Sequence, residues 1–181
     1  NALNLSQGFP DFAAPEALLD CLVEATRQGF NQYAAGDGWL PLREQVAQQF
    51  VQRDQVQLDI TQEITITSGA TIALYCAIQA LIHAGDEVII FDPSYDSYAP
   101  AVELAQGVSV RIPLLAPDFQ VDWQQVKDSI NSRTRMIIVN TPHNPSGAIW
   151  SKQDWLTLIE LIEGHNIVVL SDEVYEHLIY D

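Results

Sequence analysis

Val168-Val169-Leu170-Ser171-Asp172-Glu173-Val174-Tyr175 is the most informative stretch of this sequence. It is an apolar run that ends in polar side chains, which is typical of a buried parallel strand. Three further segments with special chemistry are expected at strand ends: Thr67-Ser68-Gly69-Ala70-Thr71, Asp92-Pro93-Ser94-Tyr95 and Asn140-Thr141-Pro142-His143-Asn144-Pro145. Because open α/β sheets bind ligands outside the carboxyl ends of their strands, four such ends predict one shared site.

Apolar periodicity predicts that helices and strands alternate along the chain. The expected helices are 15–28, 41–51, 70–83, 97–105, 123–130 and 152–163, and the expected strands are 64–67, 88–91, 108–112, 136–139 and 167–170. This alternation favours an α/β fold with a mostly parallel sheet and helices on both faces. Residues 1–40 are expected to form a separate N-terminal arm before residues 41–181, because connections inside α/β units are short.

Composition and charge indicate a globular protein and exclude some partners. The chain has 181 residues, of which 48% are hydrophobic and 18% charged, and its net charge is −16. This charge would repel nucleic acid and acidic membrane surfaces. No segment approaches the roughly 20 apolar residues that span a bilayer, so we expect no membrane partner.

Cysteine and histidine spacing gives no sign of a metal or redox site. Cys21 and Cys76 lie in expected helices without ligand spacing, so we expect both to be buried apolar residues of a protein in a reducing, cytoplasmic compartment. The four histidines show no ligand spacing either. We therefore expect no metal.

The segment Ser68-Gly69-Ala70-Thr71 stands where a strand is expected to become a helix. Unpaired N–H groups of the first helical turn, the positive end of the helix dipole and two hydroxyls would meet there, and this combination suits a phosphate. A plain helix cap is the alternative, because Ser and Thr are common N-cap residues.

Polar and aromatic side chains at the other strand ends suit a flat, charged ligand. Asp172 comes after an apolar run, so its carboxylate should be poorly hydrated and need a cation, either an arginine or the protonated nitrogen of a bound ring. Tyr175 can present its hydroxyl on the same side, prolines stiffen the loop of Asn144, and Tyr95 can cover a ring by offset stacking. A helix cap for Asp172, core packing for Tyr175, a turn for Asn144 and a surface loop for Tyr95 are the alternatives.

Together these motifs resemble those of the class I/II aminotransferases, enzymes of fold type I that use pyridoxal 5′-phosphate. The resemblance covers almost the whole chain, through Asn4-Leu5-Ser6-Gln7-Gly8-Phe9-Pro10-Asp11-Phe12, Asn31-Gln32-Tyr33, Ser68-Gly69-Ala70-Thr71, Gly85-Asp86-Glu87-Val88, Asp92-Pro93-Ser94-Tyr95-Asp96-Ser97-Tyr98, Asn140-Thr141-Pro142-His143-Asn144-Pro145 and Ser171-Asp172-Glu173-Val174-Tyr175. Within the family, the sequence resembles bacterial methionine aminotransferases and kynurenine/glutamine aminotransferases. The resemblance implies that residues 41–181 are part of the cofactor-binding large domain of fold type I, incomplete at the C-terminus. It also implies a homodimer, with residues 1–40 as the N-terminal arm and interface segment.

The resemblance implies cofactor contacts for four of the candidate residues. Ala70 and Thr71 would hold the phosphate, and Tyr95 would stack on the pyridine ring. Asp172 would pair with the ring nitrogen and keep it protonated, so that the ring can accept electrons from the substrate's α-carbon.

The same resemblance implies roles for the remaining candidates. Asn144 and Tyr175 would hydrogen-bond the phenolic oxygen of the cofactor. Tyr33 would reach the phosphate of the partner across a dimer interface, and Gly8 would lie where the substrate carboxylate binds.

The sequence departs from the family pattern at the Schiff-base lysine, which in the family follows the strand that ends at Asp172. The only lysines here are Lys127 and Lys152, both in expected helices. We therefore expect a fragment of an aminotransferase that moves an amino group between an L-amino acid (methionine, aromatic or glutamine-like) and a 2-oxo acid. A pyridoxal phosphate-dependent carbon–sulfur lyase and a noncatalytic ligand-binding protein are the alternatives.

Overall fold

The computed structural model describes residues 8 and 12–180. The chain forms two compact units, of which one ends at Thr65 and the other begins at Ile66. Within the described residues, the helices are all too short or too polar to cross a membrane.

The first unit contains helices α1 (Glu16–Arg27) and α2 (Leu40–Asp54). The apolar stripe predicted for α1 is present, but α1 has no buried residue. Cys21 is consequently exposed, and the expectation that it is buried is wrong. In α2, the buried Arg43 donates a hydrogen bond to the backbone carbonyl of Ile60 (3.0 Å) and pairs with Asp37. These contacts join the helix to the loops on either side of it.

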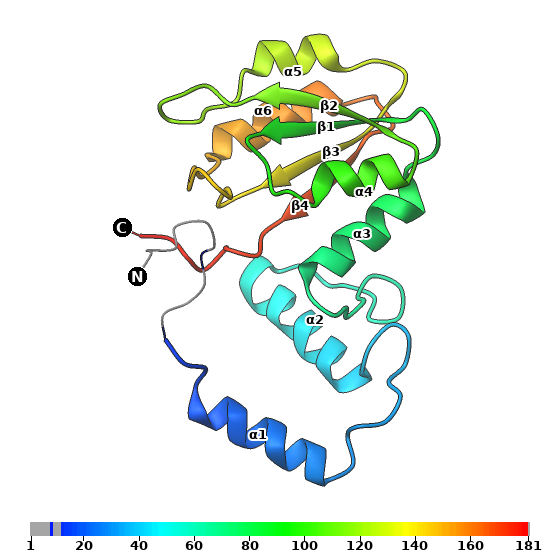
Figure 1. The fold of residues 1–181 in the computed structure, drawn as a ribbon, viewed down its shortest axis with the longest axis vertical. Coiled ribbons are helices and arrows are strands. Elements are labelled where there is room, and N and C mark those ends of the chain that lie inside the picture. Colours follow the sequence, from blue (N-terminus) through cyan, green and yellow to red (C-terminus); the bar gives the residue numbers. More distant parts are fainter. Residues whose placement is uncertain (1–7, 9–11, 181) are drawn as a thin grey trace, which may run out of the picture. The chain divides into compact units, whose positions relative to one another are not determined.

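The second unit is built on four parallel strands in the order β2-β1-β3-β4 (Figure 1). They are β1 (Glu87–Asp92), β2 (Val108–Pro113), β3 (Thr134–Asn140) and β4 (Val168–Asp172). The register places Ile90 of β1 opposite Ile138 of β3, and Asn140 of β3 opposite Asp172 of β4. Two polar residues therefore meet where β3 and β4 end.

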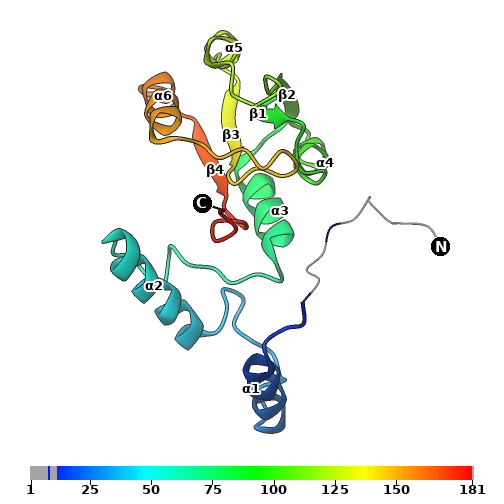
Figure 2. The same ribbon diagram turned by 90° about the vertical axis from the view of Figure 1, so that its left-hand side faces the viewer.

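Helices cover both faces of this sheet, with α3 and α4 on one side and α6 on the other in Figure 2. α3 (Ala70–Leu81) and α4 (Tyr98–Leu104) share one core with alternate strand residues such as Val88 and Ile138. α5 (Trp123–Ser129) and α6 (Lys152–Ile162) share the other with Ile89 and Ile137. Successive strand residues point to opposite faces, which explains the two cores. The predicted α/β fold is confirmed.

Three of the four tryptophans pack together on the α5–α6 face. The Trp150 ring lies 5.3 Å from that of Trp123 and 5.1 Å from that of Trp155, measured between ring centroids. It also meets Phe91 of β1 edge to face at 5.6 Å. In addition, the indole N–H of Trp123 donates to Asp154 in the first turn of α6 (3.1 Å). These contacts fasten α5 and α6 to each other and to the sheet.

Two sequence predictions for residues 64–81 are wrong. Residues 64–67 form no strand, because a strand needs a neighbour for its backbone hydrogen bonds and this segment pairs with none of the four described strands. The expectation that Cys76 is buried is also wrong, because Cys76 is exposed and α3 buries only Leu74 and Ile78. The helix contributes a single stripe to the core, as a surface helix does.

The topology opens a crevice between β1 and β3. The chain leaves β1 through α4, on one face, to reach β2, whereas it leaves β3 through α6, on the opposite face, to reach β4. These connections diverge from neighbouring strands, which is the arrangement that creates a ligand-binding crevice in open α/β sheets.

Candidate active site

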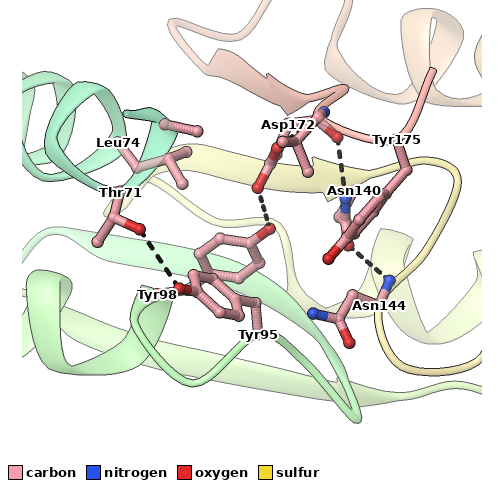
Figure 3. A pocket seen from close by; sticks show the side chains of 10 residues that line it. Thr71, Leu74, Tyr95, Tyr98, Asn140, Asn144, Asp172 and Tyr175 are labelled. Carbon is pink, nitrogen blue, oxygen red and sulfur yellow. Dashed lines mark hydrogen bonds between the residues drawn. The ribbon is translucent and has the colours of Figure 1, made fainter. Parts of the chain in front are cut away.

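A cavity of about 130 Å³ lies at this crevice, beside the carboxyl ends of β3 and β4 and the first turn of α3 (Figure 3). It is lined by Ala70, Thr71, Leu74, Tyr95, Tyr98, Asn140, Asn144, Asp172, Val174 and Tyr175. Six of the eight candidate residues from the sequence are in this set. Pockets for small molecules usually enclose about 300 Å³ or more, so this cavity by itself is smaller than a typical small-molecule site.

Asp172 ends β4 and is 8% exposed. The Tyr98 hydroxyl donates a hydrogen bond to its Oδ2 (2.7 Å), and the backbone N–H of Val174 donates to its Oδ1 (3.2 Å). A turn follows the strand, so Asp172 caps no helix. None of the described Lys, Arg and His residues forms an ion pair with it. The carboxylate is therefore buried and hydrogen-bonded but has no cation, which favours a positively charged ligand group at this position.

Tyr98 lines the cavity, although no role was predicted for it from the sequence. It is 3% exposed, and its ring meets that of Tyr95 edge to face at 5.6 Å. Burial and the adjacent Asp172 carboxylate raise the pKa of Tyr98, so its hydroxyl stays protonated and donates. The available signal was its place in the segment Asp92-Pro93-Ser94-Tyr95-Asp96-Ser97-Tyr98, three positions after the candidate Tyr95 that follows the end of β1.

Asn140 is a second residue that the sequence analysis did not identify. It is buried, and its side-chain N–H group donates to the backbone carbonyl of Asp172 (2.9 Å). Its side-chain oxygen accepts from the backbone N–H of Asn144 (2.8 Å). One amide thus fixes the backbone at two candidate residues. This role follows from the register of β3 and β4, which sequence periodicity did not reveal.

The first turn of α3 lines the end of the cavity where a phosphate was predicted to bind. Gly69 is the N-cap residue, with a φ of 87° that suits glycine, and no side chain caps the helix. The alternative in which Ser68 or Thr71 serves as the cap is therefore excluded. The Thr71 hydroxyl instead lies 3.3 Å from the Tyr95 hydroxyl. The uncapped N–H groups and the helix dipole make this end of the cavity suitable for an anion.

The side chains of Tyr95, Asn144 and Tyr175 face the same cavity from three different loops (Figure 3). All three are half-buried. Within the described part of the chain, the side-chain amide of Asn144 and the hydroxyl of Tyr175 have no hydrogen-bond partner. Both polar groups are therefore available to a ligand.

His143 lies beside the cavity, although the sequence analysis assigned it no role. It is buried, its Nδ1 is 2.7 Å from the Ser146 hydroxyl oxygen, and its ring donates to the backbone carbonyl of Pro93. Burial lowers its pKa, so the imidazole is neutral. It joins the loops that follow β1 and β3. No group of three or more His, Cys, Asp or Glu residues in 8 and 12–180 could hold a metal ion.

The whole chain, residues 1–181, matches the family described as aminotransferase class I and II. This chain belongs to that family. The resemblance inferred from the motifs is confirmed. Aminotransferases of this family use pyridoxal phosphate. The cavity brings together a carboxylate, a helix start and an aromatic ring, the three kinds of group that the resemblance assigns to the binding of this cofactor.

The relatives are aminotransferases of several specificities. The chain is 52% identical to methionine aminotransferase of Escherichia coli over 98% of its own length and 46% of that protein. It is 35% identical to kynurenine–oxoglutarate transaminase 1 of Mus musculus over 100% of its length and 46% of the relative. The chain thus spans about half the length of the curated relatives that it matches.

Solved structures of aminotransferases have the same fold. The crystal structure of YbdL from Escherichia coli, described as having a methionine aminotransferase function, gives a TM-score of 0.94 at 52% identity over 97% of this chain and 47% of that one. An aromatic aminotransferase from Pyrococcus horikoshii gives 0.92 at 36% identity over 97% and 47% of the two chains.

The two other candidate residues, Gly8 and Tyr33, belong to the first unit. Both are exposed there, and Tyr33 lines a hollow beside α1. Most of the Asn4–Phe12 motif lies outside the described residues. Lys127 and Lys152 lie in α5 and α6, as expected, and neither lines the cavity.

Proposed function

We propose that the protein containing this chain is a pyridoxal phosphate-dependent aminotransferase that moves an amino group between an L-amino acid and a 2-oxo acid. The supporting observation is the single cavity in which a buried carboxylate without a cation, an uncapped helix start and an aromatic ring face one another. Relatives named for methionine and for aromatic amino acids support substrates of these kinds, and a glutamine-like substrate is proposed from the sequence resemblance alone.

The residues of the cavity fit this cofactor. Asp172 would pair with the protonated ring nitrogen and Tyr95 would stack on the ring, since each is oriented toward the cavity. The N–H groups at the start of α3, next to Ala70 and Thr71, would bind the phosphate. When bound, pyridoxal phosphate supplies a ring that accepts the electron pair left on the α-carbon of the substrate.

Two polar side chains of the cavity that have no hydrogen-bond partner in the described part of the chain would orient the cofactor. The Asn144 amide and the Tyr175 hydroxyl would both hydrogen-bond its phenolic oxygen. Neither lysine of this chain lines the cavity, so the proposal requires a lysine from outside these 181 residues for covalent attachment.

Replacement of Asp172 by Asn in the native gene product tests this proposal. The Asp172→Asn change keeps the size of the side chain but removes the charge that would hold the ring nitrogen protonated. We expect turnover to fall on the order of 100-fold or more, with an unchanged circular dichroism spectrum. The control is Asp118→Asn, at an exposed acid outside the cavity, which should keep full turnover.

Near-normal turnover of the Asp172→Asn variant would contradict the assignment. The product analysis also separates the reaction classes: oxo acid formed from methionine indicates transamination, whereas pyruvate released from cystathionine indicates a carbon–sulfur lyase.

We further propose that the protein is a homodimer in which residues 1–40 form the arm and interface segment, with Tyr33 near the partner's phosphate site and Gly8 near the substrate carboxylate. Support comes from α1, whose apolar stripe is exposed within its unit, because exposed apolar patches commonly mark protein interfaces.

A further inference from the structure

Tyr98 contacts both of the side chains that would hold the cofactor ring. Its hydroxyl donates to Asp172 Oδ2 (2.7 Å), and its ring packs edge to face against Tyr95, at 5.6 Å and an interplanar angle of 75°. Figure 3 shows the two tyrosine rings side by side below Asp172. No other residue of the cavity has described contacts of this kind with both.

The surroundings of Tyr98 fix its position. It is the first residue of α4 and belongs to the buried core that α3 and α4 share with the sheet. The second carboxylate oxygen of Asp172 accepts from the backbone N–H of Val174, so two donors from different elements set the plane of the carboxylate. Asn140, by contrast, binds only the backbone carbonyl of Asp172.

A neutral donor suits this place better than a cation would. An arginine or lysine beside Asp172 would neutralise the carboxylate and compete with a positively charged ligand. Burial and the carboxylate raise the pKa of Tyr98, so the hydroxyl remains a donor that orients the carboxylate and leaves its negative charge available.

We propose that Tyr98 is a positioning residue of the site: its hydroxyl holds the Asp172 carboxylate toward the cofactor ring nitrogen, and its ring supports Tyr95 in the stacking position. This inference rests on the proposed function. It adds a residue that acts through Asp172 and Tyr95 without touching the substrate.

Variants at position 98 separate its two contacts. Tyr98→Phe removes the hydroxyl and keeps the ring, and Tyr98→Leu removes both. In the native gene product freed of cofactor, we expect Tyr98→Phe to weaken the affinity for pyridoxal phosphate roughly tenfold, as loss of a hydrogen bond to a charged group does. Tyr98→Leu should weaken it further. The matched control is Tyr75→Phe, which deletes the hydroxyl of an exposed tyrosine of α3 outside the cavity.

A double-mutant cycle shows whether Tyr98 acts through Asp172. In the Asp172→Asn background, Tyr98→Phe should change the cofactor Kd by less than about twofold, because contacting residues are not additive. An equal loss in both backgrounds, or no loss in the wild-type background, would overturn the inference. If Asp172→Asn alone leaves the Kd unchanged, the proposed function fails instead.

A milder change keeps the test decisive should Tyr98→Phe not fold. Site-specific 3-fluorotyrosine at position 98 retains the shape and the hydrogen bond but makes the hydroxyl more acidic. It should change the cofactor Kd by about twofold or more, and this change should disappear in the Asp172→Asn background. A Kd that is unchanged, or that changes equally in both backgrounds, would overturn the inference.

Discussion

His143 illustrates how one buried side chain can join two loops of the site without carrying charge. The backbone N–H of Ala148 donates to the Ser146 hydroxyl oxygen, which lies 2.7 Å from His143 Nδ1. The ring donates its own N–H to the carbonyl of Pro93. The Ser146 hydroxyl can donate to an unprotonated Nδ1, and this arrangement fits the neutral imidazole that the burial-lowered pKa favours.

The neutral state of His143 predicts a pH dependence of stability. Its pKa in the folded protein lies below the ordinary value of 6.5, so between these two values the unfolded chain binds more protons. The free energy of unfolding should therefore be fully retained above about pH 6.5 and decrease as the pH falls below it. In the His143→Gln variant, this part of the pH dependence of the free energy of unfolding should be absent.

Urea unfolding between about pH 5 and 7.5 measures this effect. The control is His165→Gln, at an exposed histidine, which should keep the wild-type dependence. The same slope in wild type and in His143→Gln would show that His143 is not its source.

At the level of elements, Leu158 is the most deeply buried side chain with which α6 packs against the sheet, beside the partly buried Trp155, Leu161 and Ile162. Leu158 is 1% exposed and is the only buried residue of α6. Leu158→Ala should lower the free energy of unfolding by about 2–5 kcal/mol, because it leaves a cavity in the core. Leu156→Ala, at a residue of the same helix that is 42% exposed, should cost about 0.5 kcal/mol or less. Chemical denaturation measures both, and similar losses would contradict the packing described.

The helices and parallel strands were largely predictable, because periodic apolar residues determine which faces are buried. β4 and α6 lie within two residues of their expected bounds. The expected strand 64–67 was wrong because a strand depends on a neighbour that local sequence does not reveal. The exposure of α1 could not be predicted either, since an apolar stripe indicates a face that needs a partner but not where that partner is.

The gathering of Tyr95, Asn144 and Asp172 around one cavity followed from a simple rule, in which polar residues after apolar runs meet at the ends of parallel strands. This rule did not identify Tyr98 and Asn140 as site residues. Their contacts depend on how α4 packs and on which residue of β3 stands opposite Asp172, and both are properties of the assembled sheet.

For the whole molecule, the exposed stripe of α1 predicts self-association. Leu22 is 64% exposed on a helix with no buried residue. If the stripe forms a dimer interface, Leu22→Glu in the native gene product should place a charge in it and shift the protein from dimer toward monomer in sedimentation velocity experiments. Gln153→Glu, at an exposed position of α6, should leave the dimer intact. A wild-type monomer, or a Leu22→Glu variant that remains fully dimeric, would contradict this assignment of the interface.

The convergence of Trp123 and Trp155 on Trp150 gives the second unit its own spectroscopic signature. Rings about 5 Å apart at steep angles couple their electronic transitions, and Trp150 also touches Phe91, one residue before the end of β1. The remaining indole, Trp39, is more than half exposed in the first unit. Near-ultraviolet circular dichroism will therefore report mainly on whether α5 and α6 stay packed on their face of the sheet. This signal can be recorded during any titration without a label.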